Sequence, residues 1–405
     1  MPVKKARLAP PRLGISLRAV LSEPKDRFLS RLASKIFLTG LQIVTLLLLV
    51  GYASAAEQKA SGQAEFEKTL AAAKKEGKVV VAIPPVPELR KQLETTFKEK
   101  FGIEIELAPA PGPANANRIA SEQKAGVRYF DALICGTGTA IPLVHEGMLE
   151  PIEPNLILPE VKDPKNWWGG HIWEDNVSTR RFLYSFLAEV GTGGLWYNPI
   201  LAKAEELRSF DDLLNPKWKG KIGLSDPRVP SSGQSLWSFL WEIKGEDYLR
   251  KLVQQDLFVS RDLRQVADGL AKSKFAVTIG AGHSQYEPFL KSGLPVRQLP
   301  TPVEGLPASN GFGIVGIVKN PPHPNGARLF LNWLLSREGQ DTYGRVMKAA
   351  TRRLDVDTKW LLEYGTAAAK DSLTMEEYNR VRNHLEDKYA KVRAPAGKFA
   401  EQILK

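Results

Sequence analysis

The most informative segment of the sequence is Arg208–Ser235, RSFDDLLNPKWKGKIGLSDPRVPSSGQS. It predicts a short helix, a turn, a strand at Lys221–Leu224 and a Ser/Gly-rich loop that opens a second helix. Ser209 and Asp212 have the spacing of a capping box, which predicts where the first helix begins. The start of the second helix has free backbone N–H groups and small side chains, which suit an anion or a polar ligand. On spacing alone, an ordinary capped helix start is the simpler interpretation.

This stretch resembles the s-f-x-D-L-l-x-P-k-w-k-G-k-i-x-x-x-D-P segment of extracellular solute-binding proteins, the ligand receptors of bacterial ABC importers. The resemblance is to the branch related to ferric-iron-binding proteins and runs from about Phe66 to about Arg353. It implies an α/β chain with the type II periplasmic-binding-protein fold, in which a hinge joins two lobes. It also implies a small-molecule solute as ligand, an ABC transporter permease at the inner membrane as partner, and no enzymatic activity.

The resemblance also implies a division of the chain. Residues 1–56 are expected to be a signal peptide with a long basic n-region. Lobe 1 is expected at residues 57–183 and, after the chain returns, at 310–353, with lobe 2 at 184–309. Residues 354–405 are expected to form a helical C-terminal extension that packs on lobe 1 and has no chemistry of its own.

The leader has the parts of a secretory signal. The uncharged apolar run Ile36–Val50 follows a basic segment, and small residues come directly after it at Ala53–Ala56. Cleavage is expected just before Ala56 or Glu57, which places the mature protein in the periplasm. The alternative is an uncleaved anchor, since Ile36–Ala56 could just span a bilayer core of about 30 Å.

The charge of the chain is concentrated in this leader. Nine Lys or Arg and two acidic residues lie in residues 1–56, so they carry +7 of the net charge of +11 and leave +4 for the remainder. Basic residues in the remainder alternate with acidic ones, which argues against nucleic acid as a partner. The single cysteine, Cys135, excludes an internal disulfide and, at the end of an apolar run, is expected to be buried.

Strands and helices alternate along the mature chain, which favours a largely parallel sheet. A buried strand at Lys78–Ile83 precedes a helix with apolar residues every four positions, and Tyr129–Cys135 precedes another helix. The later strands are expected at Arg181–Ala188, Gly194–Asn198, Phe275–Ile279, Pro295–Leu299 and Gly311–Lys319.

No catalytic or cofactor motif in the sequence has the neighbouring elements that its function requires. Gly311–Gly316 matches G-x-G-x-x-G, but no helix follows it, so we interpret it as a hinge strand. The chain has no P-loop, no G-x-S-x-G and no H-E-x-x-H, and its five histidines are not paired at metal-binding spacing. We therefore expect no catalytic residues, no cofactor and no resident metal.

Three loops at strand ends are the expected ligand site, because open α/β sheets bind ligands beyond the carboxyl ends of their strands. They are Gly136–Thr139, Asp226–Gly233 and His283–Tyr286. Two arginines on segments that the family places near the cleft join them, since a guanidinium suits carboxylate, phosphonate or sulfonate. The predicted ligand-binding residues are Gly136, Thr137, Gly138, Thr139, Arg118, Arg180, Asp226, Arg228, Ser231, Ser232, Gly233, His283, Gln285 and Tyr286.

Ferric iron is the alternative ligand. The iron branch typically carries adjacent tyrosines after this strand, whereas this chain has Gln285 and then Tyr286, one phenolate. Fe(III) favours several anionic oxygen ligands, so Tyr286 with His283 would need a bound anion to complete the site. The favoured ligand is therefore a small organic solute of anionic character. The protein is expected to act as a monomer. An exported enzyme on the same scaffold is a further alternative.

Overall fold

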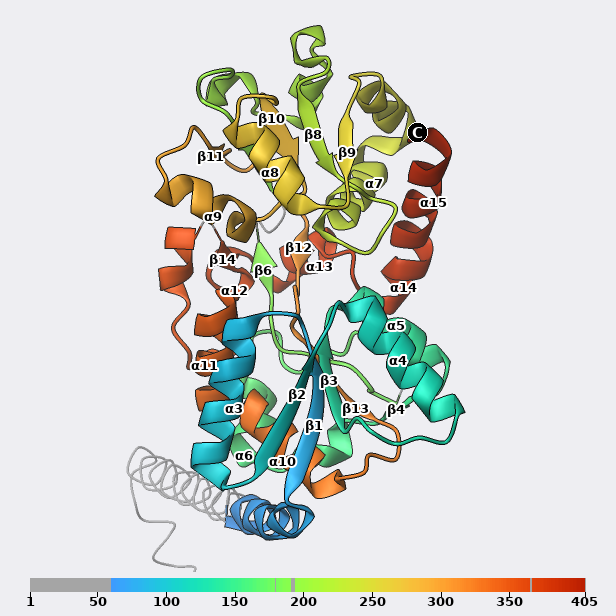
Figure 1. Ribbon diagram of the computed structural model, residues 1–405, viewed down its shortest axis with the longest axis vertical. Helices are drawn as coiled ribbons and strands as arrows, with labels where there is room; N and C mark the ends of the chain where they lie inside the picture. Colours follow the sequence, from blue (N-terminus) through green and yellow to red (C-terminus); the bar gives the residue numbers. More distant parts are fainter. Residues whose placement is uncertain (1–59, 179, 191–193, 365, 405) are drawn as a thin grey trace, which may run out of the picture. The chain divides into compact units, whose positions relative to one another are not determined.

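Two β-sheets, each with its own helices, make up most of the structure (Figure 1). This computed structural model describes residues 60–178, 180–190, 194–364 and 366–404. The strands of the first sheet are β1 (Lys78–Ile83), β2 (Glu104–Pro109), β3 (Ala132–Cys135), β4 (Leu149–Glu150), β5 (Tyr184–Ser185) and β13 (Ile314–Val318). Their order is β2–β1–β3–β13–β4, and β5 also pairs with β13. Strands β1, β2 and β3 are parallel, while β13 runs antiparallel to β3.

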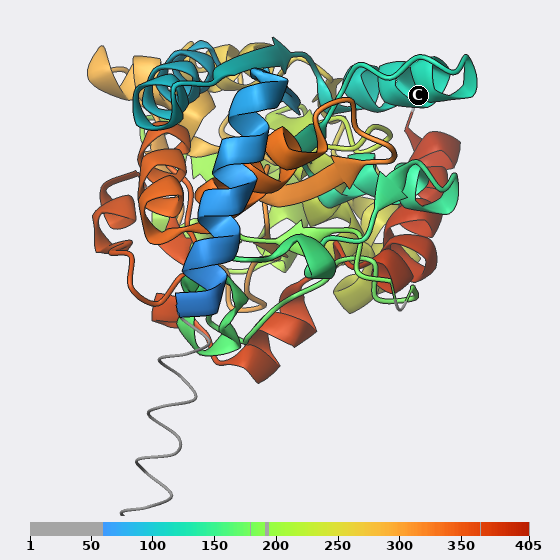
Figure 2. The ribbon, with the colours of Figure 1, turned by 90° about the horizontal axis from the view of Figure 1, so that it is seen from below.

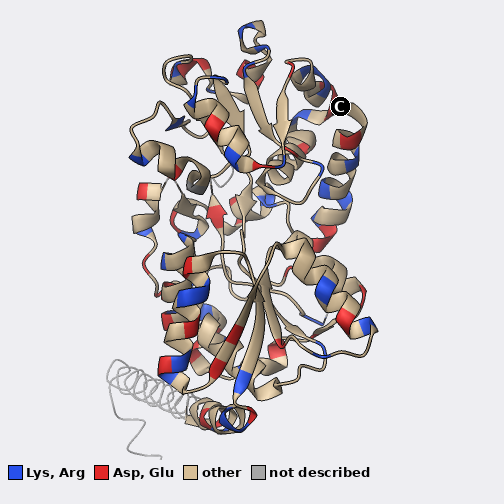
Figure 3. Cartoon of the chain, viewed as in Figure 1, with Lys and Arg blue, Asp and Glu red and all other residues tan. Residues whose placement is uncertain are grey.

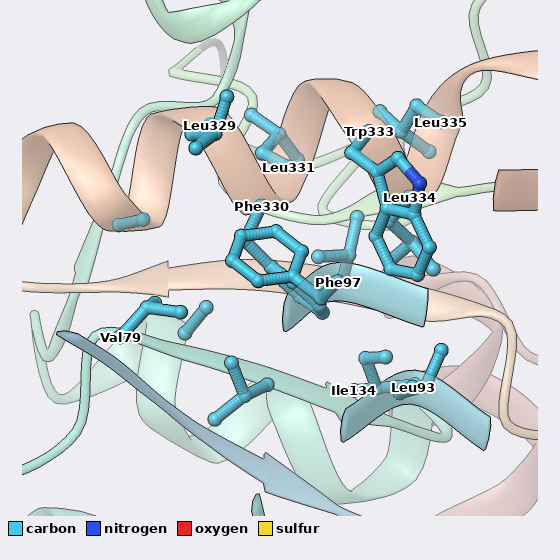
Figure 4. Packing of buried hydrophobic residues seen from close by; sticks show 14 of the residues in the cluster. Val79, Leu93, Phe97, Ile134, Leu329, Phe330, Leu331, Trp333, Leu334 and Leu335 are labelled. Carbon is cyan, nitrogen blue, oxygen red and sulfur yellow. The ribbon is translucent and has the colours of Figure 1, made fainter. Parts of the chain in front are cut away.

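The first sheet is buried on both faces because the side chains of β1 alternate. Val79, Val81 and Ile83 face one core with α3 (Pro87–Phe101), α10 (Pro324–Leu335) and α11 (Arg337–Met347). In that core Phe97 of α3 packs against Trp333 of α10, with ring centroids 5.5 Å apart (Figure 4). Val80 and Ala82 face the other core with α4 (Gly112–Lys124) and α5 (Thr137–His145). We call this sheet with its helices lobe 1.

The second sheet has the order β11–β7–β10–β8–β9 and forms lobe 2 with its helices. Its strands are β7 (Leu195–Tyr197), β8 (Ile222–Ser225), β9 (Phe258–Ser260), β10 (Val277–Ile279) and β11 (Arg297–Gln298). Its helices are α7 (Ser232–Val253, kinked at Gly245), α8 (Leu263–Ala271) and α9 (His283–Lys291). The predicted strand and helix start in Arg208–Ser235 are confirmed as β8 and α7, and the α/β two-lobe fold is confirmed with them.

A third, small sheet lies between the lobes, and two of the chain crossings run through it, at β6 and at β12. It consists of β6 (Glu189–Val190), β12 (Ala308–Ser309) and β14 (Ala367–Ala368), with β6 in the middle. The predicted boundary after residue 183 comes early, because Tyr184 and Ser185 of β5 still pair with β13 in lobe 1. The chain enters lobe 2 only at β7.

The C-terminal extension runs from one lobe to the other. Its elements are α12 (Ala369–Ser372), α13 (Met375–Val381), α14 (Glu386–Lys388), a π-helical turn (Tyr389–Arg393) and α15 (Ala394–Ile403). Near α14, the Glu386 carboxylate accepts from the backbone N–H of Val177 (3.0 Å) in lobe 1. The expectation that the whole extension packs on lobe 1 is wrong for α15. Its Ala396, Phe399 and Ala400 are buried in the core of lobe 2 against α7.

Shorter elements and the N-terminal helix complete the description. Residues 60–76 are helical, drawn in blue in Figure 2, and Phe66 packs on the core of lobe 1. The remaining short helix is α6 (Pro159–Lys162). The 3-10 turns are Glu153–Asn155, Pro164–Asn166, Ala204–Glu206, Phe210–Leu214, Pro216–Trp218 and Lys359–Tyr364. Ser209 and Asp212 form the predicted capping box at Phe210–Leu214.

The expected signal peptide lies outside the described residues. Within the described part of the chain, no helix combines the length and the apolar character needed to cross a bilayer. Lys and Arg are interspersed with Asp and Glu on both lobes (Figure 3).

Candidate functional site

The three predicted ligand segments follow strands β3, β8 and β10. We call them the α5 loop (Gly136–Thr139), the α7 loop (Asp226–Gly233) and the α9 start (His283–Tyr286), after the helices that begin there. Strands β8 and β10 are parallel, so their carboxyl ends lie at one edge of the lobe 2 sheet. A helix that starts at such an edge directs its first backbone N–H groups toward the same place.

The α5 loop is held at the edge of lobe 1 by the chain that returns to it. The Asn310 side-chain amide donates to the Thr137 hydroxyl (2.7 Å), and both residues are buried. A Cβ at Gly136 would lie 3.1 Å from the Gly311 carbonyl oxygen. Gly136 is also the N-cap of α5 and has no side chain to accept from the first-turn N–H groups. These N–H groups therefore have no side-chain cap.

The α7 loop is fixed by close contacts with the ends of β8 and β10. The Ser231 hydroxyl accepts from the Gln234 N–H (3.2 Å), which makes Ser231 the N-cap of α7. The Ser232 hydroxyl donates to the Gly280 carbonyl (2.5 Å). A Cβ at Gly233 would lie 2.4 Å from the Ser225 carbonyl oxygen, so only glycine fits there. The first turn of α7 therefore lies directly on the strand ends.

The α5 and α7 loops, one from each lobe, meet at Gly138. A Cβ at Gly138 would lie 3.9 Å from Pro230 Cβ of the α7 loop. It would also lie 3.4 Å from the ring of Tyr389, which belongs to the C-terminal extension. The structure thus brings together two of the three predicted loops, and adds a residue that sequence reasoning did not include.

Two guanidinium groups lie beside the carboxylate of the α7 loop, one from the loop itself (Arg228) and one from the chain after β9 (Arg261). Asp226 is buried, and its carboxylate accepts from Arg228 (2.8 and 3.0 Å) and from Arg261 (3.1 Å). Burial opposes ionisation of Asp226, but the two guanidinium groups lower its pKa below the usual range. One negative charge is therefore shared by two positive charges next to the N-terminus of α7.

The α9 start contributes less than its sequence suggests. Tyr286 is fully buried, its hydroxyl lies 2.5 Å from that of Thr278, and its ring stacks on Trp196 at 4.1 Å. The prediction that Tyr286 offers its phenolate to a ligand is therefore not supported by its placement. Burial raises its pKa and keeps the phenol neutral. The Gln285 side chain accepts from the Gly282 N–H (3.0 Å) and thereby caps α9.

His283 lies at the edge of the aromatic cluster. Its ring centroid is 5.8 Å from that of Trp196 in lobe 2 and 5.8 Å from that of Tyr364 in the extension. Its Nδ1 is buried without a partner among the described residues, and burial lowers its pKa. His283 is thus a neutral ring that packs against the extension. The alternative iron site of His283 with Tyr286 has no phenolate to offer, because the Tyr286 hydroxyl is buried against Thr278.

Arg118 and Arg180 do not join the loops. Arg118 is exposed on α4, where its Nε donates to Glu122 (2.7 Å) and its guanidinium lies over the rings of Tyr129 and Phe130. Arg180 is also exposed and lies 5.2 Å over the Phe182 ring. Both side chains are engaged by neighbours within lobe 1, so the structure gives no support to their assignment as ligand residues.

A buried polar network lies behind the α5 loop. Glu174 is fully buried, 3.5 Å from both the Thr137 hydroxyl and the His384 imidazole. Burial opposes its charge, but His384 and Arg382 outweigh burial and lower the pKa of Glu174 to about 2. This network ties the extension to the α5 loop through charge.

The residues missed from sequence all belong to the C-terminal extension. Tyr389 touches the α5 loop, Asn383 donates to the Ser235 carbonyl (2.9 Å) of α7, and Arg393 donates to Gln234 (3.1 Å). A signal was present, because Arg393 interrupts an otherwise apolar helix face with Val392, Ala396 and Phe399.

Among the described residues, no group of three His, Cys, Asp or Glu side chains could hold a metal ion. The cysteine, Cys135, is buried, and burial raises the pKa of its thiol to about 12. It is therefore an inert part of the lobe 1 core.

Comparisons with known proteins identify the family and the fold. A family model described as bacterial extracellular solute-binding protein matches residues 60–341. An uncharacterized protein of Haemophilus influenzae is 25% identical over 138 residues, which is 33% of this chain and 39% of the relative. The match thus spans well under half of that relative's length.

Solved structures share the fold over most of the chain. A Trichodesmium protein (IdiA, FutA), in complex with iron and citrate ligands, has a TM-score of 0.60 and 21% identity. It covers 81% of this chain and 99% of its own. AfuA of Actinobacillus pleuropneumoniae, with fructose-6-phosphate bound, has a TM-score of 0.55 and 18% identity and covers 80% and 99%. At such identities the likeness shows the periplasmic-binding-protein fold, while the two titles name different ligands.

Proposed function

Because this chain belongs to the bacterial extracellular solute-binding protein family, we propose that it is the substrate-binding component of an ABC importer. It captures a small organic anion between its lobes and delivers it to a permease at the inner membrane. The chain acts by binding rather than by catalysis, in line with the family.

The pair of guanidinium groups beside the N-terminus of α7 is the observation that carries the anionic class. Two arginines share the carboxylate of Asp226 beside the N-terminus of a helix, where backbone N–H groups also favour negative charge. The α5 loop supplies a second helix start with no side-chain cap. A carboxylate, phosphate or sulfonate group on a small molecule matches this combination.

Hinge closure is the proposed mechanism of capture. A ligand that touches both the α5 and the α7 loops binds the closed arrangement better than the open one, and so raises the closed population. The segments that would absorb the rotation are the short strands β6 and β12 and the turn Tyr389–Arg393, because the chain passes between the lobes there.

Export completes the proposal. The leader is removed just before Ala56 or Glu57, which frees the mature protein in the periplasm. N-terminal sequencing of the exported protein tests this: a start near Glu57 agrees with cleavage, whereas a retained Ile36–Val50 run would indicate an anchored receptor.

We expect an organic anion to raise the melting temperature of the purified exported protein. A ligand that binds only the native state adds about 2.7 kcal/mol of stability at about 100 times its Kd. The panel sets citrate, fructose 6-phosphate, phosphonates and sulfonates against polyamines and thiamine, in a thermal-shift assay. A response confined to the cationic compounds would contradict the anionic class.

Ferric iron is tested in the same assay as the alternative ligand, with ferric citrate against citrate alone. A gain that requires iron and disappears in Tyr286→Phe would favour iron transport. We expect no such gain, because the Tyr286 hydroxyl is buried against Thr278. Turnover of a panel compound would instead favour an exported enzyme.

A further inference from the structure

Residues 389–397 of the extension lie on the first turns of α7. The Trp237 indole N–H donates to a main-chain carbonyl of α15 (3.0 Å). A Cβ at Gly397 would lie 3.3 Å from the side-chain amide of Gln234. Gln234 is in turn bonded through its backbone N–H to Ser231, the N-cap of α7. The extension therefore borders the region where the α5 and α7 loops meet.

Arg393 is the charged residue at this contact, and it is 7% exposed. Its Nη2 donates to the neutral amide oxygen of Gln234 (3.1 Å), and its Nε is buried without a partner. Within residues 60–404, apart from the gaps, no carboxylate forms an ion pair with this guanidinium. Its aromatic neighbour is Tyr389, whose ring lies 6.0 Å away.

An isolated buried charge is expensive, because its lost hydration is not replaced by an opposite charge. Burial lowers the pKa of Arg393 to about 10, so the group is still a cation at neutral pH. The N-terminus of α7 adds partial positive charge to the same region. The nearest acid on the α7 loop, Asp226, is already shared by Arg228 and Arg261.

We propose that Arg393 binds the anionic group of the solute, so that the C-terminal extension completes the ligand site between the α5 and α7 loops. The inference rests on the proposed solute-binding function and names its recognition residue. The ligand class is a small molecule with a carboxylate, phosphate or sulfonate group, which accepts from the free N–H groups of Arg393 and from the first turn of α7. The bound anion is the missing counter-ion.

The first experiment removes the charge. Arg393→Met is compared with the unmodified protein by isothermal titration calorimetry, with citrate, fructose 6-phosphate and inorganic phosphate as probes. We expect affinity for the bound probe to fall by roughly 30-fold or more, the effect of removing one partner of a buried charge pair. Inorganic phosphate distinguishes recognition of a bare phosphate group from recognition of an organic anion.

The matched control is Arg380→Met, which removes an exposed arginine from the same extension. We expect this variant to bind as the unmodified protein does. Arg393→Lys keeps the charge but loses the planar fork, so affinity should be partly retained. An equal loss in Arg393→Lys and Arg393→Met would indicate a packing role and overturn the proposal.

A second variant supplies the counter-ion without touching Arg393. Gln234→Glu has nearly the same shape and places a carboxylate oxygen where the amide oxygen now lies 3.1 Å from Nη2. We expect the ligand-free melting temperature to rise and the affinity for the anionic probe to fall, because the guanidinium is then neutralised internally. A destabilised Gln234→Glu protein with unchanged affinity would refute the inference.

The outcomes distinguish a failure of the role of Arg393 from a failure of the proposed function. If the unmodified protein, Arg393→Met and Gln234→Glu all bind the anion equally well, the role of Arg393 fails and the proposed function stands. If the unmodified protein binds only neutral or cationic solutes, the anionic class and the role of Arg393 fail together.

Discussion

At the scale of single residues, the carboxyl group of Glu189 has a raised pKa, whereas the pKa of Asp226 beside the α7 loop is lowered. Glu189 of β6 is buried, and one carboxyl oxygen accepts from the Ala350 N–H (3.1 Å). Burial outweighs this hydrogen bond and raises the pKa of Glu189 to about 7. Its folded pKa thus lies above the ordinary value of 4.5. The unfolded chain therefore ionises this group first, and folding stability falls as the pH rises from about 4.5 to about 7.

We expect Glu189→Gln to be more stable than the unmodified protein above pH 7. The gain should be about 3 kcal/mol at pH 8 and less than about 1 kcal/mol at pH 5, from about 1.4 kcal/mol for each pKa unit. Urea denaturation at the two pH values measures it, with the exposed Glu205→Gln as control. A gain that does not change with pH would contradict the raised pKa.

At the scale of secondary-structure elements, the elements predicted correctly are those determined by residues close together in the chain. The capping pair Ser209 and Asp212, β8 and the start of α7 follow from residues adjacent in the chain, and the structure has all three. The α7 loop was predicted for the same reason. Helix α4 begins six residues before the predicted start at Arg118, because a Gly/Pro/Ala-rich opening carries no apolar period.

Long-range packing could not be predicted from sequence. Tyr286 follows a strand as a ligand residue would, but its burial depends on Trp196, which lies 90 residues away. The extension has an apolar face, and that pattern does not say which lobe it covers. Arg393 entered the candidate site only because α15 packs on α7. Arg118 and Arg180, whose side chains contact neighbours within lobe 1, were assigned by resemblance rather than by contact.

The packing of α15 on lobe 2 gives a prediction at this scale. Phe399 is 4% exposed in the lobe 2 core, so Phe399→Ala should cost about 3–5 kcal/mol of unfolding free energy. Chemical denaturation followed through tryptophan fluorescence measures this loss. Leu362→Ala, an exposed apolar residue of the same extension, should cost far less. A cost below about 1 kcal/mol for Phe399→Ala would place α15 elsewhere.

At the scale of the whole molecule, an ion pair joins the two lobes directly. Lys348, at the end of α11 in lobe 1, lies 2.7 Å from both carboxylate oxygens of Glu287 on α9 in lobe 2. The Lys348 ammonium also lies 4.6 Å from the ring centroid of Tyr364. The pair therefore stabilises the arrangement in which α9 and α11 are close.

We expect Lys348→Met to weaken solute binding by about two- to fivefold without unfolding the protein. The pair is partly exposed, so its contribution to closure should be at most about 1 kcal/mol. Calorimetric titration with the bound solute measures the change, which should diminish at high salt. Arg345→Met is the control, because Arg345 pairs with Asp341 inside lobe 1 (3.0 Å). Equal affinities for Lys348→Met and the control would exclude a role in closure.

The number of chain crossings between the lobes has a practical consequence. The chain passes between the lobes near β6, near β12 and again at the π-helical turn Tyr389–Arg393, and three is an odd number. A chain that crosses an odd number of times begins in one lobe and finishes in the other: Phe66 is buried in lobe 1, and Phe399 in lobe 2. Fluorescent donor and acceptor groups attached near the two ends of the mature chain would therefore report lobe movement as energy transfer, and the protein is a ready scaffold for a genetically encoded sensor of its own solute.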